Sequence, residues 1–161
     1  MDKSLIVKKI ISVLRADLAA LQLAVKVAHE SATHGESKAE NKYDTRGLEA
    51  AYLAHGQARR AEDIDAALRV YEKIDPFSLQ EPSLVIGISS MVQLEDQSGL
   101  TRWLWIGAEA GGLSLSVDGK TFTLVTPKSP LGAALVSRQQ GDVFELCVAD
   151  TLMEYEILAA Y

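Results

Sequence analysis

Several features are scarce in this chain of 161 residues. Its single cysteine, Cys147, has no partner for an internal disulfide, which fits a reducing compartment. No apolar run approaches the ~18 residues that cross a membrane. Lys8 and Lys9 interrupt the first apolar run at once, so the start does not have the pattern of a secretory signal. We therefore expect a cytoplasmic protein without disulfides.

Proline is absent from the first 74 residues, which also hold only three of the eleven glycines and three of the ten aromatic residues. The charge divides at the same place. Residues 1–74 carry 12 Lys/Arg and 11 Asp/Glu, whereas residues 75–161 carry 4 and 11. The net charge of −6 therefore comes from the second part of the chain. We predict two differently built domains, at residues 1–75 and 83–161, joined by a linker at residues 76–82.

The first part has the pattern of a helical hairpin. Apolar residues recur at alternating steps of four and three, which is a heptad seam. A second, alanine-rich stretch over residues 45–74 has a seam of smaller residues, which lets two helices approach closely. We expect an antiparallel coiled coil with a polar tip at residues 35–44; a self-associating coiled coil with an ordinary loop is the alternative. The first seam is Val7, Ile11, Leu14, Leu18, Leu21, Val25, Ala28 and Ala32, and the second is Ala51, Ala54, Ala58, Ala61, Ile64, Leu68 and Tyr71.

The polar tip carries acidic residues at a regular spacing. Glu36, Glu40 and Asp44 recur every four residues, so they share one side of a helix or cluster in a turn. Carboxylates at an exposed tip suit a metal ion or a basic site on a partner. In the alternative interpretation, Asp44 is the N-cap of the second helix and the glutamates are solvated beside Lys38 and Lys42.

The second part predicts a small α+β domain. Short apolar runs alternate with turn signals, and Asp118-Gly119 predicts a hairpin between two of them. Ser129 and Pro130 predict the cap and first residue of a helix that runs to about Arg138. Cys147 has apolar neighbours in a predicted strand, so we expect it to pack rather than to act as a nucleophile. The expected strands are residues 83–94, 102–106, 113–117, 121–125, 143–148 and 155–158.

Motifs of common enzymes match only in part. His29 and His34 are one residue too far apart for the helical zinc site of a protease. Gly119-Lys120-Thr121 ends like a phosphate-binding loop but lies between two predicted strands. We therefore do not expect an enzyme with its own active site.

One motif carries a family resemblance. The order of a strand, a Ser129-Pro130-Leu131-Gly132 helix, Gly141-Asp142 and a strand with Tyr155-Glu156-Ile157 resembles the C-terminal signature of bacterial Gre transcription elongation factors. The resemblance implies an antiparallel coiled coil followed by an FKBP-like domain. It also implies that the coil enters the secondary channel of RNA polymerase, where tip carboxylates help to hold the catalytic Mg²⁺. The polymerase then cleaves the 3′ end of backtracked RNA.

The tip matches this family in part. The family tip resembles Gly-Asp-Leu-Lys-Glu-Asn-Ala-Glu-Tyr, and aligned without gaps Gly35, Lys38 and Tyr43 match it. Glu36 then takes the first acidic position and Ala39 the second; a shift by one residue aligns Glu40 instead. The resemblance makes Glu36, Glu40 and Asp44 assisting residues, with Glu36 and Glu40 ligands of the polymerase Mg²⁺; the chain has no cofactor of its own.

Basic residues follow the tip. Lys42, Arg46, Arg59 and Arg60 are candidate contacts for nascent RNA or an acidic polymerase surface. The alternative for Arg59 and Arg60 is a solvated helix face balanced by the acidic residues that follow. We expect a monomeric factor that stimulates RNA cleavage by the polymerase. A non-cleaving regulator of the same channel is the alternative, and a prolyl isomerase activity of the second domain is a weaker one.

Overall fold

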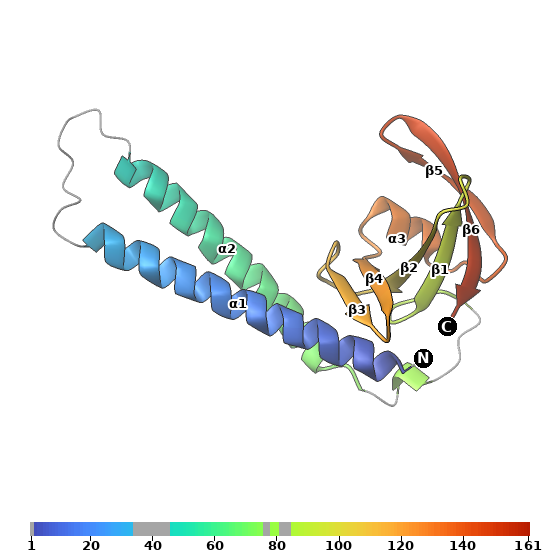
Figure 1. Ribbon diagram of the computed structural model, residues 1–161, viewed down its shortest axis with the longest axis horizontal. Helices are drawn as coiled ribbons and strands as arrows, with labels where there is room; N and C mark the ends of the chain where they lie inside the picture. Colours follow the sequence, from blue (N-terminus) through green and yellow to red (C-terminus); the bar gives the residue numbers. More distant parts are fainter. Residues whose placement is uncertain (1, 34–45, 76–77, 81–84) are drawn as a thin grey trace. The chain divides into compact units, whose positions relative to one another are not determined.

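The computed structural model describes residues 2–33, 46–75, 78–80 and 85–161, and Figure 1 shows its elements in chain order. The chain divides into two compact units. The sheet unit comprises Met1–Ile10 and Val70–Tyr161, and the helical unit comprises Ile11–Arg69. The predicted order of a long helix pair followed by an α+β domain is confirmed. The domain limits predicted from composition stay a prediction.

Helix α1 spans Lys3–Thr33. The Asp2 side chain caps it, because its Oδ1 accepts a hydrogen bond from the Ser4 backbone N at 2.8 Å. At 1.5 Å per residue the helix is about 46 Å long. Between residues 15 and 27, only the predicted seam residues Leu18, Leu21 and Val25 are half-buried, and all others are exposed. None of the described helices is long and apolar enough to cross a membrane.

Helix α2 spans Arg46–Glu72 and runs in the opposite direction to α1 (Figure 1). The prediction of Ala58 in its seam is wrong, because Ala58 is exposed and Gln57 is half-buried in its place. The heptad spacing explains the difference. Spacings that alternate between three and four residues lead from position 54 to 57 and 61, whereas the prediction chose the smaller residue at 58. The seam on the described residues is Ala54, Gln57, Ala61, Ile64, Leu68 and Tyr71.

The second domain is built on one six-stranded sheet with the strand order β3-β4-β2-β1-β6-β5. The β2 and β4 strands are parallel, and all other neighbours are antiparallel. The β3–β4 hairpin turns at Asp118 and Gly119, which both have positive φ as predicted. The elements are the 3-10 helix η1 (Ser78–Gln80), β1 (Met91–Asp96), β2 (Thr101–Ile106), β3 (Ser114–Val117), β4 (Lys120–Val125), α3 (Pro130–Leu135), β5 (Val143–Val148) and β6 (Thr151–Ala160).

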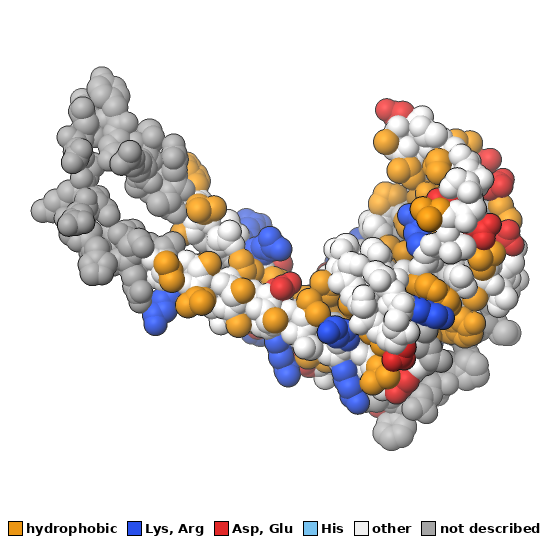
Figure 2. Space-filling model, viewed as in Figure 1, with side chains coloured by type: hydrophobic (Ala, Val, Ile, Leu, Met, Phe, Trp, Pro, Cys, Tyr) orange, Lys and Arg blue, Asp and Glu red, His pale blue; other side chains and the backbone are white. Residues whose placement is uncertain are grey.

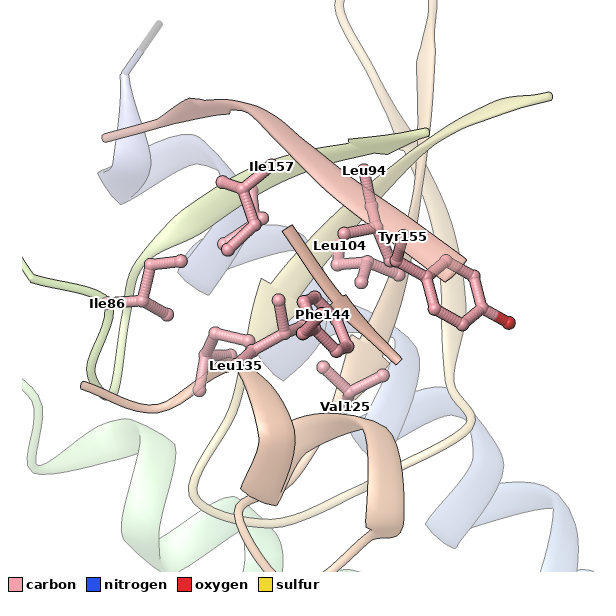
Figure 3. Packing of buried hydrophobic residues seen from close by; sticks show 10 residues of the cluster. Ile86, Leu94, Leu104, Val125, Leu135, Phe144, Tyr155 and Ile157 are labelled. Carbon is pink, nitrogen blue, oxygen red and sulfur yellow. The ribbon is translucent and has the colours of Figure 1, made fainter. Parts of the chain in front are cut away.

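One face of this sheet carries a continuous apolar core, to which α3 contributes Leu135. Paired residues of neighbouring strands point to the same face, so the register pairs Val92 with Leu104 and Phe144 with Tyr155 in one layer. Phe144 and Tyr155 also stack, with ring centroids 5.6 Å apart. Figure 3 shows these side chains converging, with labels on Ile86, Leu94, Leu104, Val125, Leu135, Phe144, Tyr155 and Ile157.

The opposite face of the sheet is aromatic over β2 and β4. Trp103 pairs with Phe122 and Trp105 with Leu124 in the parallel register. Trp105 and Phe122 are fully buried. The Trp103 ring is half-buried and has Lys120 Nζ 4.1 Å from its centroid. Because both faces of the central strands are apolar, these strands form the interior of the unit.

Two predicted boundaries are wrong for a shared reason. Residues 85–90 are not part of a strand, since β1 begins at Met91, and α3 ends at Leu135 rather than near Arg138. Ser137 has a φ of 69°, which ends the helix. The backbones around these positions bond to each other instead: Ile86 N donates to Arg138 O at 2.7 Å, and Ser137 N donates to Ile86 O at 2.9 Å. These bonds join segments about 50 residues apart, which local sequence patterns do not report.

The C-terminal hairpin corrects two further predictions. Strand β6 starts at Thr151, four residues before the predicted start, and pairs with all of β5. Cys147 is exposed, so the prediction that it packs is wrong. Phe144 of the same strand faces the core, and side chains alternate along a strand, so the odd-numbered Cys147 lies on the other face.

Candidate functional site

The predicted acidic tip lies outside the described residues. Helix α1 ends at Thr33 and α2 begins at Arg46, so the two helices flank the segment that holds Glu36, Glu40, Lys42 and Asp44. The tip roles of these four residues therefore stay predictions. Among the residues that the structure describes, no group of three or more His, Cys, Asp or Glu side chains could hold a metal ion.

Basic residues lie along the helices that flank this segment. Arg46 is the first residue of α2. Arg59 and Arg60 are exposed at the middle of α2, and neither forms an ion pair with a described residue. Arg69, farther along α2, is paired with Asp65 at 2.6 Å. Figure 2 shows the blue basic side chains spread along both helices. Arg59 and Arg60 are therefore available to an anionic partner.

Exposed apolar side chains accompany these arginines, and the sequence analysis missed them. Leu23 on α1 and Tyr52 and Leu53 on α2 are 63–69% exposed, although they are large. Figure 2 shows orange side chains at this end of the described helices. Their positions outside both heptad seams are the signal that marks them, because a long helix needs only its seam residues for packing. Aromatic and apolar groups beside arginines are typical of protein–protein contact surfaces.

The Ser-Pro-Leu-Gly motif builds the start of α3. Ser129 Oγ accepts a hydrogen bond from Gly132 N at 3.1 Å and donates to Thr126 O at 2.8 Å. Pro130 occupies the first turn, where its missing N–H costs nothing. A Cβ at Gly132 would collide with the Thr126 carbonyl, so only glycine fits there. The motif thus fixes the short connection from β4 into α3, and each of its polar groups serves the fold.

Tyr71 joins the end of α2 to a loop of the sheet domain. Its hydroxyl donates to Glu109 O at 2.7 Å, and Gly107 leaves the space that this hydroxyl needs. Burial raises the pKa of Tyr71 to about 12. Lys128, just before α3, forms a 2.8 Å ion pair with the Glu109 side chain. Within the sheet unit, the loop around Glu109 therefore contacts both the last turns of α2 and the β4–α3 connection.

Solved structures of transcription factors resemble this chain. The transcription factor Gfh1 is 24% identical over 96% of this chain and 92% of that one, with a TM-score of 0.41. GreA factor homolog 1 of Thermus thermophilus is 23% identical over 96% and 94%, with a TM-score of 0.37. Transcription elongation factor GreA/GreB of Nitrosomonas europaea is 19% identical over 60% and 78%, with a TM-score of 0.37. No protein-family model and no curated protein matches the sequence. Because these TM-scores lie below 0.5, we argue function from the chain's own residues.

Proposed function

We propose that this protein is a cytoplasmic Gre-type transcription elongation factor. In this proposal the helix pair enters the secondary channel of RNA polymerase, and the tip stimulates RNA cleavage in backtracked complexes. The chemistry belongs to the polymerase, and this protein has no active site or cofactor of its own.

The motif at the start of α3 carries the proposal. Ser129-Pro130-Leu131-Gly132 lies between a strand and a Gly141-Asp142 turn that leads to the last two strands, which is the order in the Gre signature. A long helix pair with an acidic segment between its helices precedes it. A helix of about 40 Å or more also has the length to carry a tip far from the domain that it belongs to.

The tip residues supply the donors that the proposed role needs. Carboxylate oxygens are the ligands that Mg²⁺ prefers, and Glu36, Glu40 and Asp44 provide three of them within nine residues. We propose that Glu36 and Glu40 approach the Mg²⁺ of the polymerase, which activates water when bound. Lys42, Arg46, Arg59 and Arg60 would then contact nascent RNA or an acidic polymerase surface.

A cleavage assay on backtracked elongation complexes tests this proposal. The wild-type chain should accelerate release of short 3′ RNA fragments, and a variant with Glu36, Glu40 and Asp44 all changed to alanine should lose at least a hundredfold of this stimulation. The triple variant should still bind core polymerase in a pull-down, because the helices and the sheet domain are intact. Absence of stimulation by the wild type would contradict the cleavage role.

A second candidate function is a regulator that occupies the same channel without cleavage. Ala39 favours it, since it stands where the ungapped alignment has the second acidic residue of the family, and a metal site tolerates little displacement of its ligands. In this case the wild type should compete with a cleavage-competent Gre factor for the polymerase and should slow cleavage by that factor. Failure to bind polymerase at all would exclude both candidates.

A further inference from the structure

Strand β5 forms an open edge of the sheet. Among the described strands it pairs only with β6, on one side. The hairpin turn at Ala149 and Asp150 has two residues, so the pair Val148–Thr151 next to it is hydrogen-bonded and the pairs along the strands alternate from there. The N–H and C=O groups of Val143, Glu145 and Cys147 consequently point away from β6.

Hydrogen bonds on the far side of β6 agree with this alternation. Glu154, the partner of Glu145, directs its backbone groups toward residue 97: Gln97 N donates to Glu154 O at 3.0 Å, and Glu154 N donates to Gln97 Oε1 at 3.3 Å. Groups of a paired residue point in the opposite direction, so those of Glu145 face the edge. In the described part of the chain, no backbone group outside β6 bonds to Val143, Glu145 or Cys147.

The side chains of these three edge residues lie on a face with four carboxylates, of which Glu145 is one. Glu145 pairs directly with Glu154, and Glu156 pairs directly with Glu95 on β1. None of the four forms an ion pair with a described residue. Like charges directly opposite each other destabilise a sheet. Figure 2 shows red acidic side chains gathered over β5 and β6, next to orange ones.

Exposed apolar groups flank Glu145 on the same face. Val143 is 52% exposed, Cys147 is exposed, and Leu152, the cross-strand partner of Cys147, is 58% exposed. Along the edge the order is therefore apolar, acidic, apolar. A strand added here would place its own residues opposite these three, about 4.8 Å away.

A second copy of this chain does not fit the edge. The symmetric antiparallel register that uses all three edge residues pairs Val143 with Cys147 and Glu145 with its own copy. That register adds another pair of opposed glutamates to a face that already holds two. The charge of the edge instead favours a strand with a cation at the central position.

We propose that β5 binds an extended segment of a partner protein by strand addition, and that this segment carries Lys or Arg opposite Glu145 with apolar residues two positions before and after it. The backbone of Val143, Glu145 and Cys147 supplies the hydrogen bonds, and Glu145 with Glu154 behind it selects the cation. This inference goes beyond the proposed function and does not depend on the acidic tip.

Amide NMR shifts of the full chain test it, with the peptide acetyl-Thr-Val-Thr-Lys-Thr-Val-Thr-amide as the probe. We expect shifts at Val143, Glu145 and Cys147, and binding at least threefold tighter than that of the same peptide with Glu in place of Lys. Glu145→Lys should remove this preference, whereas Glu62→Lys, the same charge change on α2, should keep it. Cys147→Pro removes one edge N–H without removing a bond to β6 and should weaken binding at least tenfold.

Three results would overturn the proposal. One is the absence of shifts at the edge residues with 1 mM peptide, a concentration on the order of the weakest specific affinities. Another is equal binding of the lysine and glutamate peptides by the wild type. The third is concentration-dependent broadening of the same amides without peptide, which would mean that a second copy occupies the edge. Because Glu145→Lys keeps all backbone groups, it remains informative if Cys147→Pro does not fold.

Discussion

At the scale of single residues, the Ser-Pro-Leu-Gly motif at the start of α3 meets a structural requirement. The Thr126 carbonyl constrains both Ser129 and Gly132: the Ser129 hydroxyl donates a hydrogen bond to it, and a Cβ at position 132 would collide with it. The hydroxyl needs this carbonyl as an acceptor, and the glycine leaves room for it. We therefore expect substitutions of Ser129 or Gly132 to change the stability of the sheet unit before they change the binding of any partner.

Gly132→Ala should destabilise the sheet unit by about 1–3 kcal/mol, because its Cβ would meet the Thr126 carbonyl carbon at 2.6 Å. Urea denaturation followed by tryptophan fluorescence measures this change. Gly87→Ala is the matched control, since a Cβ there meets nothing within 4 Å. Equal stability of the two variants would mean that the β4–α3 connection has room to move.

Tyr71→Phe should cost about 1 kcal/mol through the lost hydrogen bond to Glu109 O. The raised pKa of Tyr71 adds a pH dependence. The folded pKa of Tyr71, about 12, lies above the ordinary value of 10.0. The contribution of Tyr71 to the free energy of unfolding is therefore fully present below pH 10 and is lost as the pH rises toward 12. The difference in unfolding free energy between wild type and Tyr71→Phe should shrink over this range. Tyr52→Phe, at an exposed site, is the matched control and should change the free energy of unfolding by less than about 0.5 kcal/mol.

At the scale of elements, the described seam of α2 contains a polar residue, Gln57, with one atom that has no hydrogen-bond partner among the described residues. Gln57 Oε1 is buried and has no hydrogen-bond partner in the described structure. A buried acceptor without a donor costs free energy, and the flanking seam residues Ala54 and Ala61 are small. The polar residue therefore weakens the seam in the part of the helix pair nearer to the tip.

Gln57→Leu should stabilise the protein by about 1 kcal/mol, because it removes the unsatisfied group and adds apolar surface to the seam. Thermal unfolding followed by circular dichroism at 222 nm measures the gain. Ala58→Leu adds a similar side chain at the neighbouring exposed position and should change stability by less than about 0.5 kcal/mol. A larger gain in stability from Ala58→Leu than from Gln57→Leu would mean that position 58, as predicted from the sequence, belongs to the seam.

The elements also show which features local sequence patterns determine. The α1 seam from Val7 to Val25, the Asp118-Gly119 turn and the bounds of β5 follow from periodicity and turn chemistry, and the structure confirms them. The early end of α3 and the loop before β1 depend on bonds between Ile86 and residues 137–138, which no local pattern encodes. For the candidate site, Arg59 and Arg60 are exposed, which both the predicted contact role and the alternative of a solvated helix face require, so the contact role stays a prediction. Leu23, Tyr52 and Leu53 lie outside the predicted seams as well, so the sequence already held the signal of their exposure.

At the scale of the whole molecule, the two parts of the chain differ in net charge. The residues after 74 carry the entire negative balance, whereas the helix pair is close to neutral, and Arg59 and Arg60 form no ion pair with a described residue. Association with the nucleic acid of an elongation complex should therefore depend on the helices and should weaken with salt.

Arg60→Glu should weaken binding to an elongation complex severalfold at about 0.1 M salt and reduce the salt dependence of binding. Arg69→Glu is the matched control, because it makes the same charge change on the same helix at a residue that is already paired with Asp65. Electrophoretic mobility shifts across a salt series measure both. Equal losses for the two variants would indicate a response to net charge alone.

The composition of the sheet unit determines when this protein completes its fold during synthesis. Ile6 and Ile10 are fully buried, and they belong to the same compact unit as β6, whose residues leave the ribosome last among its strands. The central strand β1 likewise waits for β6, its neighbour in the sheet, about 60 residues later in the chain. The sheet therefore stays incomplete until β6 has been synthesised, because β1 and β5 both pair with it, and only then can the sheet unit complete its fold.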